Sequence, residues 1–339
     1  MTDLINKIAQ KQILTKEESK ILQENILENK FSEEEIIKIF KNLEKRNLEA
    51  HELLGIVEAT REKMKRIKID FDAIDTAGTG GDRLGTYNIS TAAAIIIASA
   101  GIPVVKHGNR SATSKCGSAD VLEELGVKID LDEKKALKVL KKAGIVFLFA
   151  PNFHPAFKNV SEARKKYGRA TYFNILGPMV NPASPSHQII GIFDPRYKQA
   201  MGKTMIDSGS KKIWVVHNEK NKMDEISPIE NTQVMEFTKK NPEGEKLQII
   251  PENLGLNAGK IEDLFGGIKE INAAIMRNVL QGRSNPAQKN AAIINAAAGL
   301  VVFGKAKDMQ SAVKKVEELV KSGKAFEKLE EFIYISNSV

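Results

Sequence analysis

The chain has 339 residues, of which 42% are hydrophobic and 28% are charged, a composition that is ordinary for a globular protein of about two domains. Its single cysteine, Cys116, excludes an intramolecular disulfide and any metal site built on a cluster of thiolates. The formal net charge of +8 favours an anionic partner, either a nucleic acid or a phosphorylated small molecule, unless the lysines only keep helix surfaces solvated.

The N-terminal part of the chain is predicted to be helical. Its first residues, MTDLINKIAQ, lack a signal-peptide pattern and no apolar run in the chain could span a bilayer, so we expect a cytoplasmic protein with no membrane partner. The segments Thr15–Glu18 and Ser32–Glu35 both fit a capping box, which marks the start of a helix. We therefore expect a small helical domain over residues 1–68, completed by a helical segment near 155–180.

From Asp70 onward, short apolar runs alternate with helical stretches. The runs of strand type are 102–105, 144–149, 188–193, 211–216 and 234–237. The helical stretches are 91–100, 134–143, 198–208 and 288–303, followed by two amphipathic stretches at 312–321 and 324–332. This alternation is typical of a mostly parallel sheet covered by helices. The sequence therefore predicts an α/β protein, with a small all-helical N-terminal domain and a larger sheet domain over residues 70–339.

The segment DTAGTGGDRLGTYNIST, residues 75–91, is rich in glycine and hydroxyl groups and lies between a predicted strand and a predicted helix. Glycines there expose backbone N–H groups, and a helix N-terminus adds its dipole, so the segment predicts a phosphate or pyrophosphate site. It is not a nucleotide P-loop, because no lysine follows its last glycine. A flexible turn is the alternative, but Asn88, Ser90 and Thr91 supply more polar groups than one helix cap requires.

Polar residues also follow the next predicted strands. Lys106, His107 and Arg110 come after the strand at 102–105, at the edge where open α/β sheets bind ligands. Lys106 could neutralise a leaving phosphate, whereas Arg110 could equally be a surface charge and a lone histidine is often structural. The segment APNFHP follows the next strand, and Arg164 lies on a predicted helix, where a surface salt bridge is its alternative role.

Two adjacent carboxylates, Asp224 and Glu225, lie in a predicted loop after the strand at 211–216. Hard divalent cations prefer oxygen ligands, and Mg²⁺ often takes one or two carboxylates together with substrate phosphates. The dipeptide is a weak signal by itself, but beside a pyrophosphate loop it predicts a magnesium site.

Taken together, these motifs resemble the anthranilate phosphoribosyltransferase family over nearly the whole chain. They are GTGGD at 78–82, NIST at 88–91, KHGNRS at 106–111, GSADVLEELG at 117–126, FAPNFHPA at 149–156, FNILGPMVNP at 173–182 and DEIS at 224–227. The resemblance implies transfer of the phosphoribosyl group from 5-phosphoribosyl diphosphate (PRPP) to the amine of anthranilate. The products would be N-(5-phosphoribosyl)anthranilate and diphosphate, in tryptophan biosynthesis. It also implies about two Mg²⁺ ions per active site, a homodimer formed through the helical domain, and no nucleic-acid partner.

The resemblance also implies roles for individual residues. The diphosphate and ribose of PRPP would contact Gly78, Gly80, Gly81, Asp82, Asn88, Ser90, Thr91 and Lys106. The anthranilate path would be lined by His107, Asn109, Pro151, His154, Arg164, Gly177 and Pro178. Thr79, Thr86, Gly108 and Ser118 complete the expected substrate-binding residues, and Ser90, Asp224 and Glu225 would bind magnesium. Lys106, Asp82 and His107 are the expected catalytic residues, with no dedicated general base because the amine of anthranilate is already uncharged.

The sequence departs from the family pattern in two places. The family has an arginine in a G-x-R-T motif, whereas residues 168–171 place Ala170 at that position, so either Arg169 replaces the arginine or the contact is lost. The segment before Asp224 is glycine-rich in the family, but residues 218–223 contain no glycine.

Two other functions are possible on the sequence alone. A pyrimidine nucleoside phosphorylase of the same architecture also attacks the ribose carbon beside a phosphate loop, but it needs neither KHGNRS nor the carboxylate pair. A non-catalytic, nucleic-acid-binding relative would agree with a pI of about 9.2. It would not need the magnesium pair either.

Overall fold

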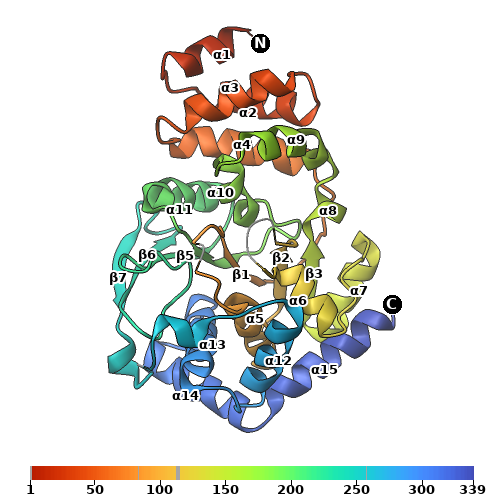
Figure 1. Ribbon diagram of the computed structural model, residues 1–339, viewed down its shortest axis with the longest axis vertical. Coiled ribbons are helices and arrows are strands. Elements are labelled where there is room, and N and C mark those ends of the chain that lie inside the picture. The colour runs from red at the N-terminus through yellow and green to blue at the C-terminus, as the bar shows by residue number, and fades with distance from the viewer. Residues whose placement is uncertain (1, 83, 112–114, 257) are drawn as a thin grey trace.

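A computed structural model describes residues 2–82, 84–111, 115–256 and 258–339, and its N-terminal part is helical (Figure 1). The helices are α1 (Thr2–Ala9), α2 (Lys16–Leu27), α3 (Glu33–Leu43) and α4 (Ala50–Lys63). Both predicted capping boxes are present. The Thr15 hydroxyl accepts the Glu18 N–H and the Glu18 carboxylate accepts the Thr15 N–H, and Ser32 and Glu35 exchange the same bonds.

In the part of the chain that the structure describes, seven strands form one sheet in the order β3-β2-β1-β4-β5-β6-β7. Their bounds are β1 Ile74–Gly78, β2 Val104–Gly108, β3 Ile145–Phe149, β4 His187–Gly191, β5 Lys212–His217, β6 Thr232–Thr238 and β7 Glu245–Ile249. Strands β1 to β5 are parallel, and β6 and β7 are antiparallel additions at one edge. This confirms the predicted mostly parallel sheet. The prediction missed β7, because four of its five residues are exposed and it shows no apolar run.

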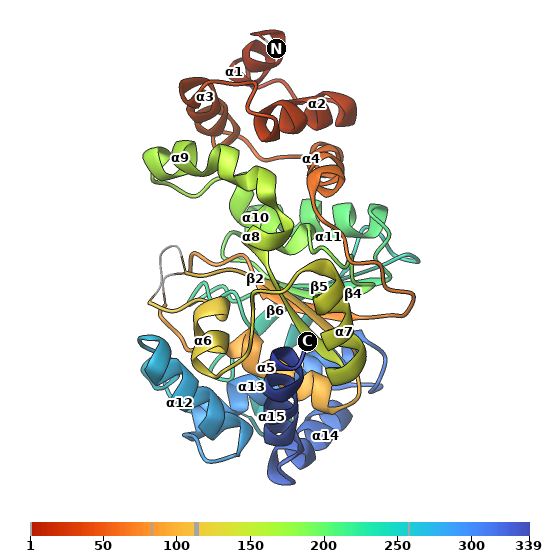
Figure 2. The same ribbon diagram turned by 90° about the vertical axis from the view of Figure 1, so that its right-hand side faces the viewer.

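Helices cover both faces of the sheet (Figures 1 and 2). The helices after α4 are α5 (Ile89–Ser99), α6 (Ser118–Glu124), α7 (Glu133–Ala143), α8 (Ala150–Phe153), α9 (Lys158–Tyr167), α10 (Tyr172–Met179), α11 (Lys198–Asp207), α12 (Lys269–Leu280), α13 (Pro286–Val302), α14 (Met309–Lys321) and α15 (Lys324–Asn337), of which α9 lies beside the N-terminal helices. In Figure 2, α10 and α11 lie between the sheet and the N-terminal helices, while α5, α13, α14 and α15 lie on the opposite side. The predicted α/β class is thus confirmed.

The buried apolar residues among those described form two clusters, one on each face of the sheet. The larger one contains α5 and α13, whose alanines and isoleucines are almost completely buried. The other joins buried residues of α1 to α4 with those of α9, α10, α11 and strands β4 and β5. The segment near 155–180 therefore packs on the N-terminal helices, whereas the domain division itself stays a prediction. Within the described residues, no helix combines the length and the apolar character that crossing a bilayer requires.

Candidate active site

The glycine-rich loop leaves the sheet at the carboxyl end of β1. Its first four residues, Asp75–Gly78, belong to the strand, so the loop begins later than the sequence predicts. Gly80, Gly81 and Gly85 all have positive φ, at 66°, 95° and 71°, a conformation that side chains other than glycine rarely adopt. The glycines are thus required by the backbone path, which leads directly into the N-terminus of α5.

Two glycines on neighbouring strands make room for Asp224. Gly78 of β1 and Gly191 of β4 are register partners. A Cβ on Gly78 would lie 2.4 Å from Asp224 Oδ2, and one on Gly191 would lie 1.6 Å from the Asp224 carbonyl oxygen. The glycine pair therefore places the carboxylate against the first turn of the loop. Gly191 was not predicted as a site residue, because nothing in its own strand pattern marks it.

The first amides of the loop are bonded within the protein. The Thr79 N–H donates to the Gly191 carbonyl at 2.8 Å, and the Gly80 N–H donates to Asp224 Oδ2 at 2.7 Å. The amides of Thr79 and Gly80 are therefore not free to bind a ligand in this structure. Pairing between β1 and β4 extends one residue beyond Gly78, and the Asp224 carboxylate occupies the place at the Gly80 N–H where a ligand anion would bind.

Three carboxylates gather beside this turn. Burial raises the pKa of Asp224, with smaller contributions from the nearby carboxylates of Asp82 and Glu225. Burial also raises the pKa of Glu225 to about 7, although Lys106 opposes the shift. Glu225 Oε1 accepts the Ser90 N–H at 3.2 Å. The positive charge near these carboxylates is too small to balance them, and the Ser90 hydroxyl lies beside them. Such a set of oxygen ligands fits a hard cation such as Mg²⁺. The described residues contain no complete group of three His, Cys, Asp or Glu ligands, so other oxygens would have to complete the coordination.

Lys106 is buried on the same face as Ser90. Its Nζ donates to the Thr76 carbonyl at 2.6 Å and to Ser90 Oγ at 3.3 Å. Burial lowers the pKa of Lys106, whereas Asp75 and Glu225 favour its charged form. The structure therefore brings this cation to the start of α5, beside the carboxylates, as the sequence predicts.

The remaining residues expected to contact PRPP surround the start of α5. Asn88 is the residue before the helix, and its Oδ1 is buried without a partner among the described residues, as is the Thr91 hydroxyl. Thr86 forms an isolated bridge with Phe265. Unused acceptors and hydroxyls at a helix N-terminus agree with a polar ligand there, although the individual contacts stay predictions.

Two neutral histidines form the next part of the site, on the other face of the sheet. The rings of His107 and His154 lie 5.1 Å apart. Burial lowers the pKa of His107 to about 4 and that of His154 to about 3. His107 Nδ1 lies 3.1 Å from the Gly177 carbonyl, so it must carry the proton, and its Nε2 is left as an acceptor. Neither Nε2 atom has a partner among the described residues.

Aromatic rings continue from His154 toward the helical region. The His154 ring stacks on Phe157 at 4.7 Å, and Phe157 meets Phe173 edge-on at 5.6 Å. The guanidinium of Arg164 lies over the Phe173 ring at 5.4 Å. No ion pair is found for Arg164 among the described residues, and its side chain is half-buried, so the predicted alternative of a surface salt bridge is wrong for it. Phe157 and Phe173 were not predicted, since aromatic residues at helical spacing usually belong to a core.

Gly177 leaves an opening beside these rings. It lies within α10, and a Cβ built on it would meet nothing within 4 Å, although the residues on both sides of it are buried. Pro178 follows it inside the helix, and Pro151 begins α8. Gly177 thus leaves open space next to its Cα, and the anthranilate path that the resemblance implies along these residues stays a prediction.

Residues after β2 have mainly structural contacts. Gly108 is required because a Cβ there would lie 2.3 Å from Ser118 Oγ and 2.8 Å from the Phe147 ring. The Asn109 carbonyl accepts the Ala119 N–H at 3.2 Å. Arg110 forms ion pairs with Asp120 and Glu123, so its role as a surface charge is confirmed.

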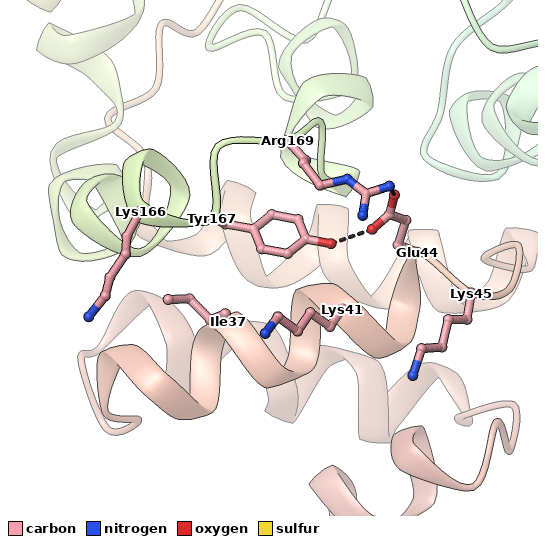
Figure 3. Close-up of a pocket in the computed structure, with 7 residues that line it drawn as sticks. All are labelled: Ile37, Lys41, Glu44, Lys45, Lys166, Tyr167 and Arg169. Atoms are coloured by element: carbon pink, nitrogen blue, oxygen red, sulfur yellow. Dashed lines mark hydrogen bonds and ion pairs between the residues drawn. The ribbon is translucent and has the colours of Figure 1, made fainter.

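Arg169, the candidate replacement for the family arginine, is ion-paired within the helical region. Its guanidinium forms an ion pair with Glu44 at 2.5 Å, at the C-terminal end of α3. Figure 3 shows this pair beside the Tyr167 hydroxyl, which also bonds Glu44. Together with Ile37, Lys41, Lys45 and Lys166, these residues line an open groove of about 730 Å³ that contains none of the predicted site residues.

Comparisons with known proteins find relatives of this chain over nearly its whole length. A family model described as "Glycosyl transferase family, a/b domain" matches residues 70–326. The anthranilate phosphoribosyltransferase of Syntrophomonas wolfei is 40% identical over 95% of this chain and 94% of its own. The crystal structure of the enzyme of that name from Thermus thermophilus has a TM-score of 0.92 at 32% identity, covering 99% of both chains. A Saccharomyces cerevisiae anthranilate phosphoribosyltransferase in complex with PRPP and Mg has a TM-score of 0.90 at 24% identity, covering 100% of this chain and 98% of its own, which is a likeness of fold.

Proposed function

Because the chain belongs to the anthranilate phosphoribosyltransferase family, we propose that its two-part site carries out that family's reaction. The protein transfers the phosphoribosyl group of PRPP to the amine of anthranilate and releases diphosphate, a step of tryptophan biosynthesis. The alternatives, a nucleoside phosphorylase and a nucleic-acid-binding relative, receive no support from these relatives. A biosynthetic enzyme of this kind is expected in the cytoplasm.

The observation that carries the proposal is the juxtaposition of two unlike half-sites at the carboxyl ends of β1 and β2. We call them the diphosphate half (Gly78–Asp82, Ser90, Lys106, Asp224 and Glu225) and the acceptor half (His107, His154, Arg164, Gly177 and Pro178). The diphosphate half combines buried carboxylates with the Lys106 ammonium. The acceptor half combines neutral imidazoles and neighbouring aromatic rings with the Arg164 guanidinium, which has no ion pair among the described residues. These are the two environments that a diphosphate ester and an aromatic acid require.

The diphosphate half stabilises the leaving group. Breaking the bond between the ribose carbon and the diphosphate oxygen develops positive charge on the ribose and negative charge on the diphosphate. The Lys106 ammonium and the N-terminus of α5 oppose that negative charge in a buried setting, where such effects are strongest. For PRPP to use the Gly80 N–H, Asp224 must release it, so the Gly80–Asp224 bond is expected to open when ligand binds.

Magnesium fits the Ser90, Asp224 and Glu225 oxygens. When bound, it would neutralise the diphosphate and remove the unfavourable burial of the two carboxylates. About two ions per site would agree with a protein that supplies so few ligands itself. Asp82, which contributes to the raised pKa of Asp224, would be held at the edge of the same ligand set.

The acceptor half binds and orients anthranilate. The Arg164 guanidinium supplies a planar fork for its carboxylate, with the Phe173 ring fixing the plane. The Nε2 lone pair of His107 can accept a hydrogen bond from the amine, which keeps that nitrogen directed at the ribose carbon. Since the amine attacks uncharged, His107 has no proton to remove before bond formation. Holding the two substrates in line is then the main contribution of this half.

We also propose that the groove in Figure 3 forms part of a homodimer contact. Its wall includes the half-buried Ile37 and Tyr167, and lysines form its rim. Glu33 already pairs with Lys166 at 2.7 Å, whereas the exposed Glu34 in the first turn of α3 offers a second copy an acidic group for the groove's lysines. Sedimentation equilibrium of the whole chain tests this, with Ile37→Asp expected to weaken association; a monomeric wild-type protein would overturn it.

The experiment that tests the activity follows anthranilate fluorescence in the presence of PRPP and MgCl₂. Anthranilate consumption that requires both additions is the expected result. Release of a free base from pyrimidine nucleosides and phosphate, without anthranilate consumption, would replace the proposal with the phosphorylase alternative.

A further inference from the structure

Three buried polar side chains on one face of the sheet bond to the C-terminal end of α10. Asp75 of β1 and Gln188 of β4 are register partners and so point to the same face. His107 of β2 lies on that face too, because the register of β1 and β2 places Asp75 opposite Val105, two residues earlier. The described structure thus has a polar row across three adjacent parallel strands, where α/β sheets usually carry apolar residues.

Each member of the row bonds a different residue of the segment 177–181. His107 Nδ1 donates to the Gly177 carbonyl at 3.1 Å, and Gln188 Nε2 donates to the Pro178 carbonyl at 2.8 Å. The Asn181 amide donates to Asp75 Oδ2 at 2.8 Å. Only His107 belongs to the predicted site. Asp75 and Gln188 have no exposed surface at all, so neither can contact a substrate.

Asp75 joins the end of α10 to the strand that carries Lys106 and His107. Its Oδ1 accepts the His107 N–H at 3.4 Å while its Oδ2 accepts Asn181. Asn181 in turn donates to the Val105 carbonyl at 2.7 Å and accepts the Ala183 N–H at 2.9 Å, so every bond of its amide points to the sheet or to its own turn.

A helix packed on a sheet needs no such row for stability alone. Buried polar groups are unfavourable unless every partner is in place, and apolar residues would pack α10 more simply. Hydrogen bonds, however, restrict direction and distance in a way that apolar contacts do not. The bonds are also concentrated on Gly177 and Pro178, the part of α10 that borders the opening of the acceptor half.

We propose that Asp75 and Gln188 are positioning residues that fix the acceptor half relative to the diphosphate half. This inference rests on the proposed function, because it takes Gly177 and Pro178 as the border of the anthranilate subsite. If the end of α10 shifts, the amine no longer lies in line with the ribose carbon. A displacement of about 1 Å can reduce turnover by roughly 10²-fold.

Two substitutions test the row without changing the volume of the core. Gln188→Met removes the donor to the Pro178 carbonyl. Asp75→Asn keeps the shape of the side chain but places an N–H group against either the His107 N–H or the Asn181 amide. In the fluorescence assay we expect each variant to raise the anthranilate KM and lower kcat, with kcat/KM for anthranilate reduced by about tenfold or more. For Gln188→Met the PRPP KM should stay within about twofold, since this variant leaves the loop after β1 and its contacts in place. Asp75→Asn also removes a negative charge that favours the charged form of Lys106, so the PRPP limit applies to Gln188→Met alone.

Thr204→Val is the matched control. Thr204 is fully buried and its hydroxyl donates to the Ala50 carbonyl at 2.9 Å, which ties α11 to α4 on the same side of the sheet. This variant loses one buried hydrogen bond to a carbonyl, but one that is remote from the end of α10. We expect a lower Tm with both KM values and kcat as in the wild type.

The outcomes separate the two proposals. If the wild-type protein consumes anthranilate and both row variants fall in Tm as Thr204→Val does, with kinetic constants unchanged, the row is merely structural and the inference is wrong. If the wild-type protein consumes no anthranilate, the proposed function fails and the inference fails with it. Should Asp75→Asn not fold, Gln188→Met decides the question alone, since it leaves the Asp75–Asn181 bond in place.

Discussion

The diphosphate half and the acceptor half lie on opposite faces of the same two strands, and their side chains differ in charge. Thr76 and Lys106 point to the α5 face, where charged groups are buried close to one another. Asp75 and His107 point to the α10 face, where the imidazoles are neutral and the neighbours are rings. Strand alternation separates these environments by one residue, so a single strand end can serve two substrates of different chemistry.

The two halves should therefore contribute differently to the rate and to substrate binding. Buried, poorly compensated charges are unfavourable until a ligand of the opposite charge arrives, so the diphosphate half should depend strongly on its charges for rate. The acceptor half holds a neutral ring by shape, and only Arg164 adds charge. Loss of a residue there should affect binding more than the chemical step.

The largest expected effect is loss of the carboxylate pair. Asp224→Asn combined with Glu225→Gln removes both negative charges while it keeps the side-chain volumes. We expect turnover at limiting Mg²⁺ to fall to background, by at least the ~10²–10³-fold typical of losing one preorganised charge-stabilising group. The fold should survive, because burial opposes ionisation of both groups. Circular dichroism provides the control, and unchanged turnover at limiting Mg²⁺ would refute the magnesium assignment.

The next largest effect should come from Lys106→Gln. The amide can still donate to the Thr76 carbonyl, but the positive charge opposite the leaving diphosphate is lost. We expect kcat to fall by roughly 10²-fold, with a much smaller change in the anthranilate KM. Steady-state kinetics with each substrate varied in turn measures both. A rise in the anthranilate KM with kcat intact would place Lys106 in the acceptor half instead.

These two halves differed in how well the sequence predicted them. The diphosphate half was found from local patterns, because glycines, hydroxyls and adjacent acids carry their chemistry in a few consecutive residues. Even there, Gly191 was missed, since its role depends on being the register partner of Gly78. The free amides expected from Gly78 onward were also wrong for Thr79 and Gly80, because bonds to β4 and Asp224 are tertiary contacts that no loop pattern shows.

The acceptor half was predicted mainly through resemblance. Its residues come from β2, α9, α10 and the residue after α8, and no spacing along the chain links His107 to Arg164. The sequence placed Asp75 in the glycine-rich loop, whereas the structure places it in β1, and its partner Asn181 lies more than a hundred residues away. The fold class was easier, because alternating strand and helix patterns repeat along the chain, although the exposed β7 and the helices α6 and α12 were not predicted.

A more moderate effect is expected at Arg164. Arg164→Ala removes the fork for the anthranilate carboxylate, a charge-assisted interaction typically of ~1.5–3 kcal/mol, or roughly 10- to 100-fold in affinity. The anthranilate KM should rise by about that factor while the PRPP KM changes little. Because Arg164 also covers the Phe173 ring, Arg164→Met is the control that restores packing without charge. A rise in the PRPP KM alone would remove Arg164 from the acceptor half.

The smallest effect concerns pH and separates the halves by sign. The pKa of His154 is lowered by burial to about 3, so the unfolded chain binds more protons below pH 6.5 and His154 destabilises the fold as the pH falls. The pKa of Glu225 is raised to about 7, so in Mg²⁺-free buffer it has the opposite effect and contributes stability as the pH falls. Between pH 7.5 and 5.5, His154 alone should lower the free energy of unfolding by about 1.4 kcal/mol.

Urea unfolding of wild type and His154→Gln at both pH values isolates this contribution, because the other titrating groups cancel in the difference. We expect the variant to lose less stability on acidification, whereas Glu225→Gln should lose more than the wild type. Equal losses in all three proteins would mean that the two halves do not differ in buried charge.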